Sequence, residues 1–203
     1  MSPLTLILAC TKSNGIGLQG QLPWRLPKEM KYFAAATTRA AEGKQNAVIM
    51  GRNTWESIPA KFRPLKGRLN VVISRNPEYA LGTDDASVLL RNSLKSALEG
   101  LDSLSTHRAF VIGGAQLYKE TLSLPLSSTP TEPFVDRILL TRIIEPDFEC
   151  DVFMDDFLGQ DHAATRKWTR APHDALKMWL GFDVDDGIQK EGEVKYEYQM
   201  WVR

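Results

Sequence analysis

Cysteine and histidine are scarce in this chain, and neither occurs in a pattern that would build a site. The two cysteines, Cys10 and Cys150, do not make a disulfide framework, which favours a reducing compartment and predicts a cytoplasmic protein. The three histidines, His107, His162 and His173, lack the spacing of metal ligands. We therefore expect no bound metal ion, and we interpret the histidines as structural or surface residues.

An excess of charge of either sign is also missing, because 25 Lys and Arg residues balance 25 Asp and Glu residues. A neutral chain has no global field that attracts nucleic acid or an anionic membrane, so neither partner is expected. Long hydrophobic runs are missing too. The apolar run from Leu4 to Cys10 is short and follows no basic segment, so it indicates a core strand rather than a signal peptide or membrane span.

Short apolar runs alternate with segments of helical spacing along the chain. With 43% hydrophobic and 25% charged residues, a chain of 203 residues can build one globular core. Strands are expected at Leu4–Cys10, Asn46–Met50, Leu69–Ile73, Ala109–Ile112, Arg137–Ile144 and, as an antiparallel hairpin arm, Lys195–Val202. Helices are expected after Pro27, Gly51 and Gly114 and over Ser93–Leu101. This alternation predicts an α/β domain with a largely parallel sheet.

One compositional break interrupts the pattern, and no internal repeat divides it. The Ser-, Thr- and Pro-rich stretch Leu126–Pro133 could be a linker, but the sequence after it is too short and too strand-like to fold alone. We interpret the region near 126–134 as a surface insertion within a single domain that spans residues 1–203. The polar stretch Asp183–Glu193 is expected to be a hairpin loop.

The most informative segment joins an irregular apolar loop to a helix. Pro23 and Trp24 interrupt regular structure, and Pro27 suits the first helical turn. Glu29 then shares a helical face with Phe33, four residues further on. A carboxylate that faces an aromatic-lined pocket must find a partner or shift its pKa, so Glu29 is the strongest candidate for a functional acid.

Two glycine-rich turns follow expected strands. Gly15–Gly20 matches the G-x-G-x-x-G pattern of Rossmann dinucleotide sites, but Pro23 and Pro27 prevent the helix that this fold requires, so we reject it. The segment is either a plain turn or a mobile lid whose backbone approaches a ligand. Gly113-Gly114 exposes helix N-terminal amides suited to a pyrophosphate, although tight helix–sheet packing explains this pair equally well.

Arginines and hydroxyl groups gather where three strands end, at Gly51–Thr54, Ser74-Arg75 and Gly113-Gly114. Ligands of open α/β sheets bind beyond the carboxyl ends of the strands. We interpret the coincidence as a site for a phosphorylated dinucleotide, in which guanidinium groups select NADP over NAD. Arg68, just before a buried strand, is either a loop cation or a clamp for a substrate carboxylate.

Taken in chain order, these segments resemble the dihydrofolate reductase family, and the similarity extends from about Leu4 to Val202. The motifs that carry it are Gly15–Gly17, Leu22-Pro23-Trp24, Glu29 with Phe33, Val48–Trp55, Ser57–Pro59, Arg63–Arg68, Ser74-Arg75, Val111–Gly114 with Tyr118, Thr141-Arg142 and Asp147–Asp151. Each motif is short, but their order and spacing are specific. The length and the insertion are similar to those of fungal or other eukaryotic members.

The resemblance implies an eight-stranded, mostly parallel mixed sheet with an antiparallel C-terminal strand, flanked by helices. It implies NADPH-dependent reduction of 7,8-dihydrofolate to 5,6,7,8-tetrahydrofolate, by hydride transfer to pterin C6 and protonation at N5. It also implies a monomeric enzyme of one-carbon metabolism that binds dihydrofolate and antifolate inhibitors.

The resemblance also assigns roles to individual residues. The catalytic residues it implies are Glu29, Leu22, Trp24 and Thr141. The substrate-binding residues it implies are Ile7, Glu29, Met30, Phe33, Ile58, Leu65, Arg68, Ile112, Tyr118 and Thr141. The cofactor-binding residues it implies are Ala9, Gly15, Ile16, Gly17, Leu18, Gln19, Gly20, Gln21, Arg52, Asn53, Thr54, Ser74, Arg75, Asn76, Gly113, Gly114, Ala115, Gln116, Leu117, Tyr118, Lys119 and Glu120.

Two other functions stay open at this level. A pyrimidine reductase of riboflavin synthesis shares the fold and the cofactor, but its ribose-phosphate substrate needs a phosphate site where Arg68 suits a carboxylate. A non-catalytic pterin- or nucleotide-binding protein would keep a similar pocket. The intact Glu29 and Gly113-Gly114 favour an enzyme over such a binding protein.

Overall fold

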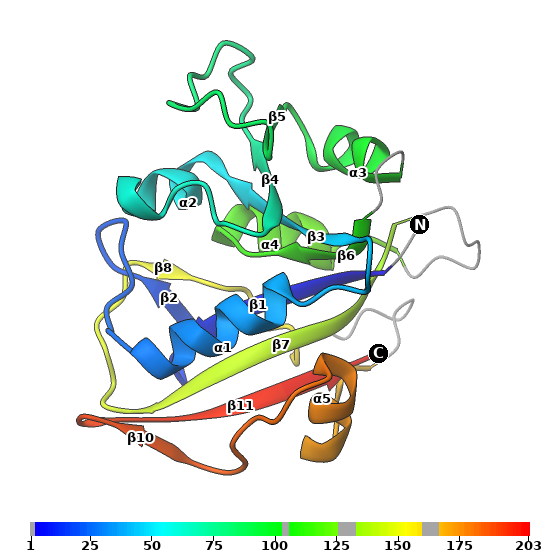
Figure 1. Cartoon of the computed structure of the whole chain (residues 1–203). Helices are drawn as coiled ribbons and strands as arrows, with labels where there is room; N and C mark the ends of the chain where they lie inside the picture. Colours follow the sequence, from blue (N-terminus) through cyan, green and yellow to red (C-terminus); the bar gives the residue numbers. More distant parts are fainter. Residues whose placement is uncertain (1–2, 103–105, 126–132, 160–166) are drawn as a thin grey trace.

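A mixed β-sheet forms the centre of the computed structural model, which describes residues 3–102, 106–125, 133–159 and 167–203 (Figure 1). Its strands are β1 (Leu4–Cys10), β3 (Gln45–Gly51), β4 (Arg68–Ile73), β5 (Val88–Arg91), β6 (Thr106–Val111), β7 (Val135–Glu145), β9 (Thr169–Arg170), β10 (Gln189–Glu191) and β11 (Val194–Val202). Eight of them follow the order β10-β11-β7-β1-β6-β3-β4-β5, and the short β9 also pairs with β11.

The direction of the strands changes at one place in the sheet. Parallel pairing joins β7, β1, β6, β3, β4 and β5. Strand β11 is antiparallel to β7, β9 and β10. The predicted class, a mostly parallel mixed sheet with an antiparallel C-terminal strand, is therefore confirmed. Strands β1 and β3 are nearly continuous apolar runs because both of their faces are covered.

The helices cover the two faces of the sheet. They are α1 (Pro27–Thr38), α2 (Arg52–Ser57), α3 (Leu94–Asp102), α4 (Ala115–Leu122) and α5 (His173–Leu180), with a 3₁₀ turn, η1, at Ala60–Phe62. Leu4, Leu6 and Leu8 of β1 pack in the same core as α3 and α4. Ile7 points to the other face and packs in the core with α1, α2 and α5.

The glycine-rich segment after β1 does not start a helix. Gly15–Gly17 forms the short strand β2, which is antiparallel to β8 (Val152–Phe153). The backbone N–H of Gln19 also donates a hydrogen bond to Oδ2 of Asp151 over 2.9 Å. Pairing with a segment far along the chain takes the place of the Rossmann helix, in agreement with the exclusion of that fold.

Several elements were not predicted: β2, β5, β8, β9, β10 and α5. The expected insertion near 126–134 lies outside the described residues except for Pro133 and Phe134, and His162 lies outside them as well. Cys10 and Cys150 are free thiols. Among the described residues, no group of three His, Cys, Asp or Glu side chains could hold a metal ion. None of the helices described is both long enough and apolar enough to cross a membrane.

Candidate active site

Glu29 lies in the first turn of α1 and is only 6% exposed. The hydroxyl of Thr141, in β7, donates a hydrogen bond to its Oε1 over 3.1 Å. Burial raises the pKa of Glu29 to about 7, although the hydrogen bond from Thr141 lowers it, and the carboxylate of Glu191 raises it further. The site therefore contains a carboxyl group that titrates near neutral pH.

The two predicted catalytic residues in the loop before α1, Trp24 and Leu22, differ in their exposure. Trp24 is buried and packs edge-on against Phe148, with 5.6 Å between the ring centroids. Leu22 is 50% exposed, so it lies at the surface of the loop. The indole N–H of Trp24 and the hydroxyl of Tyr32 are buried, and neither has a hydrogen-bond partner in the part of the chain that the structure describes. Trp24 and Tyr32 thus each carry a buried polar group that no described residue satisfies.

The carboxyl end of β1 meets α4 beside this carboxyl group. The hydroxyl of Tyr118 donates a hydrogen bond to the backbone carbonyl of Ile7 over 3.1 Å. Tyr118 is fully buried, and burial raises the pKa of its phenol, so that it remains a neutral donor. Ile112 follows β6 and donates its N–H to the carbonyl of Ile49 over 2.9 Å. These contacts place Tyr118 against β1 and Ile112 against β3, and the substrate-binding roles of Ile7, Ile112 and Tyr118 stay predictions.

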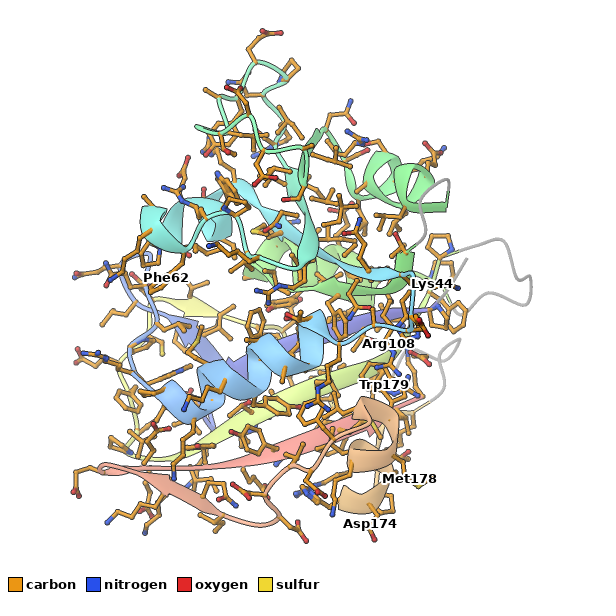
Figure 2. All side chains as sticks on the ribbon, viewed as in Figure 1. Lys44, Phe62, Arg108, Asp174, Met178 and Trp179 are labelled. Atoms are coloured by element: carbon orange, nitrogen blue, oxygen red, sulfur yellow. The ribbon has the colours of Figure 1, made fainter. Side chains whose placement is uncertain are left out.

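An apolar wall extends from Glu29 towards Arg68. Phe33, Ile58 and Leu65 are half-buried and pack at the border of the core that contains α1, and Met30 is 48% exposed on the same helix. Figure 2 labels Phe62, which lies between Ile58 and Leu65 in the chain, on the opposite side of the view from Lys44, the residue before β3. Because Arg68 is the first residue of β4, the wall runs along α1 towards the beginning of that strand.

The guanidinium group of Arg68 is held firmly at the end of this wall. Its Nη1 donates to Oγ1 of Thr37 over 2.6 Å, and its Nε donates to the carbonyl of Lys66 over 3.1 Å. Its carbon Cζ lies 6.0 Å from the centroid of the Phe33 ring. Nη2 of Arg68 donates to none of the described residues. Its N–H groups are therefore available to a ligand, while Nε and Nη1 hold the guanidinium group in place.

Two strand ends meet near the N-terminus of α4. The N–H of Gly51 donates to the carbonyl of Gly113 over 2.8 Å, which joins the ends of β3 and β6. Gly113 has a φ of +124°, and a Cβ built there would lie 3.2 Å from Oγ1 of Thr54. A side chain at Gly113 would therefore be strained. The first N–H groups of α4 also have no acceptor within the helix, as at any helix N-terminus.

The two candidate arginines for the adenosine phosphate differ in their surroundings. Arg52 lies 3.8 Å from the carboxylate of Glu56 and over the ring of Tyr79 at 5.9 Å. Arg75 is exposed and has no ion-pair partner among residues 3–102, 106–125, 133–159 and 167–203. Ser74 beside it is buried, and its hydroxyl accepts a hydrogen bond from the N–H of Asn76 over 3.2 Å. Arg75 is thus the more available cation.

Two predicted cofactor residues, Leu117 and Lys119, and the motif residue Arg142 make contacts within the protein. Leu117 packs in the core with α3, so only its backbone faces the helix N-terminus. Lys119 lies 3.4 Å from the carboxylate of Asp155. Arg142, from the Thr141-Arg142 motif, donates to the carbonyl of Thr11 over 2.6 Å and so braces the turn before β2. Each of these side chains is thus held by a contact within the protein.

Sequence reasoning missed the contribution of the C-terminal strands. Tyr198 packs against Tyr32 of α1 with 4.2 Å between the ring centroids, and Tyr196 packs against Tyr198 at 5.5 Å. The carboxylate of Glu191 accepts a hydrogen bond from the N–H of Lys28. Alternation in the last strand could have indicated the buried tyrosines, but no local pattern marks Glu191.

Known proteins similar to this chain have one enzymatic activity in common. The family model for dihydrofolate reductase matches residues 3–180. The dihydrofolate reductase of Cryptococcus neoformans is 45% identical over 98% of this chain and 94% of its own length. That of Pneumocystis carinii is 43% identical over 98% of this chain and 96% of its own. The solved structure of Schistosoma mansoni dihydrofolate reductase superimposes with a TM-score of 0.71 at 31% identity, covering 98% of this chain and 97% of that one.

Proposed function

The chain belongs to the dihydrofolate reductase family, and we propose that it reduces 7,8-dihydrofolate to 5,6,7,8-tetrahydrofolate with NADPH as the second substrate. The observation that supports this most is the buried pair of Glu29 and Thr141 beside glycine-lined strand ends. NADPH, when bound, supplies a hydride for C6 of the pterin. The protein supplies binding, orientation and control of one proton.

Glu29 is the residue proposed to hold the pterin. Thr141 occupies its Oε1, and no other residue that the structure describes donates to Oε2, which leaves that oxygen for the amino group and ring nitrogen of the substrate. Because its pKa is about 7, Glu29 exchanges a proton near neutral pH. We infer that it sets the protonation equilibrium, and that the proton reaches N5 through water or through the pterin itself.

Exclusion of water is assigned to the loop before α1. Trp24 anchors this loop in the core, while Leu22 is exposed and close enough in the chain to cover a bound pterin. Hydride transfer needs a dry and oriented pair of reactants, so a closing loop has a clear physical purpose here. The backbone carbonyls of Ile7 and Ile112 are assigned to the edge of the pterin.

Arg68 is assigned to the α-carboxylate of the glutamate tail. Its guanidinium group is fixed by Thr37 and Lys66, so little conformational entropy is lost when a carboxylate binds to the remaining donors. Phe33, Ile58 and Leu65 then pack along the benzoyl group between the pterin and Arg68. This arrangement favours a folate over a ribose phosphate.

The strand ends are assigned to the cofactor because their residues fit a phosphorylated dinucleotide. The absence of a side chain at Gly113 lets a pyrophosphate approach the backbone and the N-terminus of α4. Arg75 has no ion-pair partner in the described part of the chain, so it is assigned to the 2′-phosphate that distinguishes NADPH from NADH. We further propose that the protein is a cytoplasmic monomer, organised as one domain over residues 1–203, that binds antifolates.

The experiment that tests the function follows NADPH absorbance with purified protein in the presence and absence of dihydrofolate. We expect oxidation of NADPH that depends on dihydrofolate and stops when an antifolate is added. A protein that oxidises NADPH only with a pyrimidine ribose-phosphate substrate would be a pyrimidine reductase instead. Binding of both ligands without turnover would make it a non-catalytic binding protein.

A further inference from the structure

Helix α1, which carries Glu29, has no N-cap side chain of its own. Leu26 occupies the N-cap position and makes no side-chain hydrogen bond, and Pro27 follows it. The first N–H groups of a helix need acceptors from outside, and an anion there also interacts favourably with the helix dipole. Glu191 supplies both, because its Oε1 and Oε2 lie 3.1 and 3.2 Å from the N–H of Lys28, 163 residues away.

The C-terminal segment that carries Glu191 contacts α1 along its whole length. At the C-terminal end of the helix, Nη1 of Arg39 donates to the carbonyl of Gly181 over 3.2 Å, and its guanidinium lies 4.6 Å from the ring of Phe182. In the middle, Tyr32 packs edge-on against Phe182 at 6.4 Å. At the N-terminal end, Glu191 accepts from Lys28. One segment thus holds both ends of the helix.

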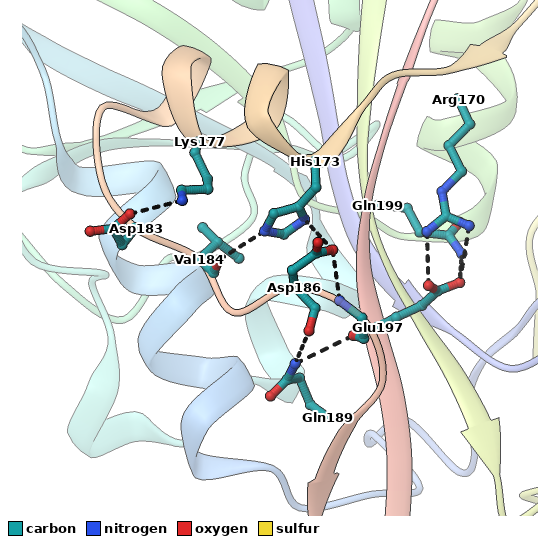
Figure 3. Close-up of polar contacts among 10 residues, drawn as sticks. Arg170, His173, Lys177, Asp183, Val184, Asp186, Gln189, Glu197 and Gln199 are labelled. Carbon is teal, nitrogen blue, oxygen red and sulfur yellow. Dashed lines mark hydrogen bonds and ion pairs between the residues drawn. The ribbon is translucent and has the colours of Figure 1, made fainter.

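The segment itself is anchored, as Figure 3 shows. The ring of His173, in α5, contacts the carbonyl of Val184 at 2.8 Å and Oδ1 of Asp186 at 3.4 Å. Nε2 of Gln189 then donates to the carbonyl of Asp186 over 2.8 Å. These contacts hold the residues before β10 and its first residue, Gln189. They therefore fix the backbone that carries Glu191.

The hairpin fixes the carboxylate as well as the backbone. Glu191 is opposite Val194 in the register of β10 and β11, and the turn between them contains Gly192 with a φ of +61°. The hydroxyl of Tyr196, in β11, also donates to Oε2 of Glu191 over 3.4 Å. The carboxylate is therefore bonded from two sides, by α1 and by β11.

We propose that Glu191 is a positioning residue for the reduction, because it caps α1 and thereby sets the orientation and the charge environment of Glu29. This inference rests on the proposed role of Glu29. The match to the dihydrofolate reductase family model ends at residue 180, and Glu191 is not among the residues to which the resemblance assigned a role.

The charges around Glu29 support a measurable effect. Four phenols from three elements interact electrostatically with this carboxyl group: Tyr32 of α1, Tyr118 of α4, and Tyr196 and Tyr198 of β11. Burial raises the pKa of each phenol, so all four are neutral in the pH range of an assay. Glu191 differs from these phenols because it is a carboxylate, and its negative charge raises the pKa of Glu29 in addition to the larger effect of burial.

The test compares Glu191→Gln with Glu193→Gln, which removes the same charge two residues away. The side chain of Glu193 makes no hydrogen bond or ion pair among the described residues. Glutamine keeps an acceptor for Lys28 but removes the charge. We expect the alkaline limb of the kcat/KM profile to move to lower pH by about half a unit in Glu191→Gln, and to stay in place in Glu193→Gln. High salt should shrink the difference.

Two further variants separate this role from a purely structural one. Glu191→Asp retains the charge, so its profile should return towards that of the unchanged protein even if its thermal stability is lower. Glu191→Gln and Glu193→Gln with identical pH profiles would overturn the proposal. If the unchanged protein oxidises no NADPH with dihydrofolate, the proposed function fails. If Glu29→Gln retains normal turnover, the role of Glu29 fails; if Glu29→Gln is inactive and Glu191→Gln is unshifted, only the positioning role of Glu191 fails.

Discussion

The hydroxyl of Thr141 donates a hydrogen bond to Oε1 of Glu29 over 3.1 Å, and both side chains are buried. The two residues are 112 positions apart, on β7 and α1. A single neutral donor stabilises the carboxylate only partly, because burial has the larger effect on its pKa. The pair therefore keeps Glu29 poised between its two protonation states.

Replacement of Thr141 by valine should raise the pKa of Glu29 further above about 7, because the hydrogen bond that lowers it is lost. The measurement is a carbon-13 NMR titration of the glutamate carboxyl groups in the apo protein. Thr121→Val is a suitable control, since the hydroxyl of Thr121 is buried but donates to the carbonyl of Leu117 within α4. A fall in the pKa of Glu29 in Thr141→Val would contradict this reading of the contact.

Glu29→Gln should lose most turnover near neutral pH while NADPH binding stays largely intact. Loss of a positioned acid–base group costs roughly 10²–10⁴-fold in rate, and this carboxylate is assigned to the pterin and not to the cofactor. Steady-state kinetics and cofactor titration measure the two effects separately. Partial recovery at low pH fits the assignment, because solvent then supplies the proton; near-normal turnover at neutral pH does not.

The stability of the apo protein should show the cost of burying Glu29. The pKa is about 7 in the folded state against 4.5 as the ordinary value, so the folded state binds the proton more tightly. Stability contributed by Glu29 is therefore full below the lower value and is lost as pH rises through this window, by about 3 kcal/mol in all. Urea unfolding at several pH values, with Glu29→Gln as the reference, checks the sign. The stability of wild type relative to Glu29→Gln should fall between pH 5 and pH 8, and a rise would refute the linkage.

Arg68→Leu should weaken binding of dihydrofolate but spare a pterin that has no glutamate tail. Loss of the charged partner leaves a carboxylate unpaired, which typically costs about 2–5 kcal/mol. The measurement compares kcat/KM for tailed and tail-less substrates. Lys66→Leu, an exposed cation two residues away, should affect neither substrate. Equal losses for both substrates in Arg68→Leu would make Arg68 a structural residue.

Thr37→Ala extends the test of Arg68 without removing the charge. Thr37 holds Nη1 of Arg68 at 2.6 Å, so its loss should loosen the guanidinium fork. We expect a smaller loss of affinity for the tailed substrate than in Arg68→Leu, and again no effect on the tail-less pterin.

Arg75→Ala should raise the KM for NADPH much more than the KM for NADH. A charge-assisted hydrogen bond to the 2′-phosphate contributes roughly 1.5–3 kcal/mol, and NADH has no such phosphate. Arg52→Ala is the matched control, because Arg52 already lies beside Glu56. If instead Arg52→Ala alone discriminates between the cofactors, the phosphate site belongs to Arg52.

Local patterns were sufficient for the elements whose own residues determine them. The run Leu4–Cys10 predicts β1 without error, since a strand buried on both faces must be apolar throughout. Pro27 predicts the start of α1, since proline is favoured in the first helical turn. Glu29 could also be selected from the local pattern, because it is an acid on the face of the helix that carries Phe33.

Other elements depend on distant partners and have no strong local signal. Strand β2 exists because β8 pairs with it, and β10 has only three residues. Helix α5 is eight residues long, and isolated helices of that length are not stable without tertiary packing. Such segments could not be predicted from periodicity, because their stability comes from contacts that the fold makes.

The sequence by itself determined which residue types were available for the reaction: one acid on a helix, an arginine before a strand and glycines at strand ends. The tertiary structure alone decided which groups meet, such as Thr141 with Glu29, Thr37 with Arg68, and Glu191 with the N–H of Lys28. The physical reason is that a pKa, a helix cap or a fixed guanidinium depends on burial and on hydrogen bonds to distant residues. Those conditions arise only when the sheet has brought the strands together.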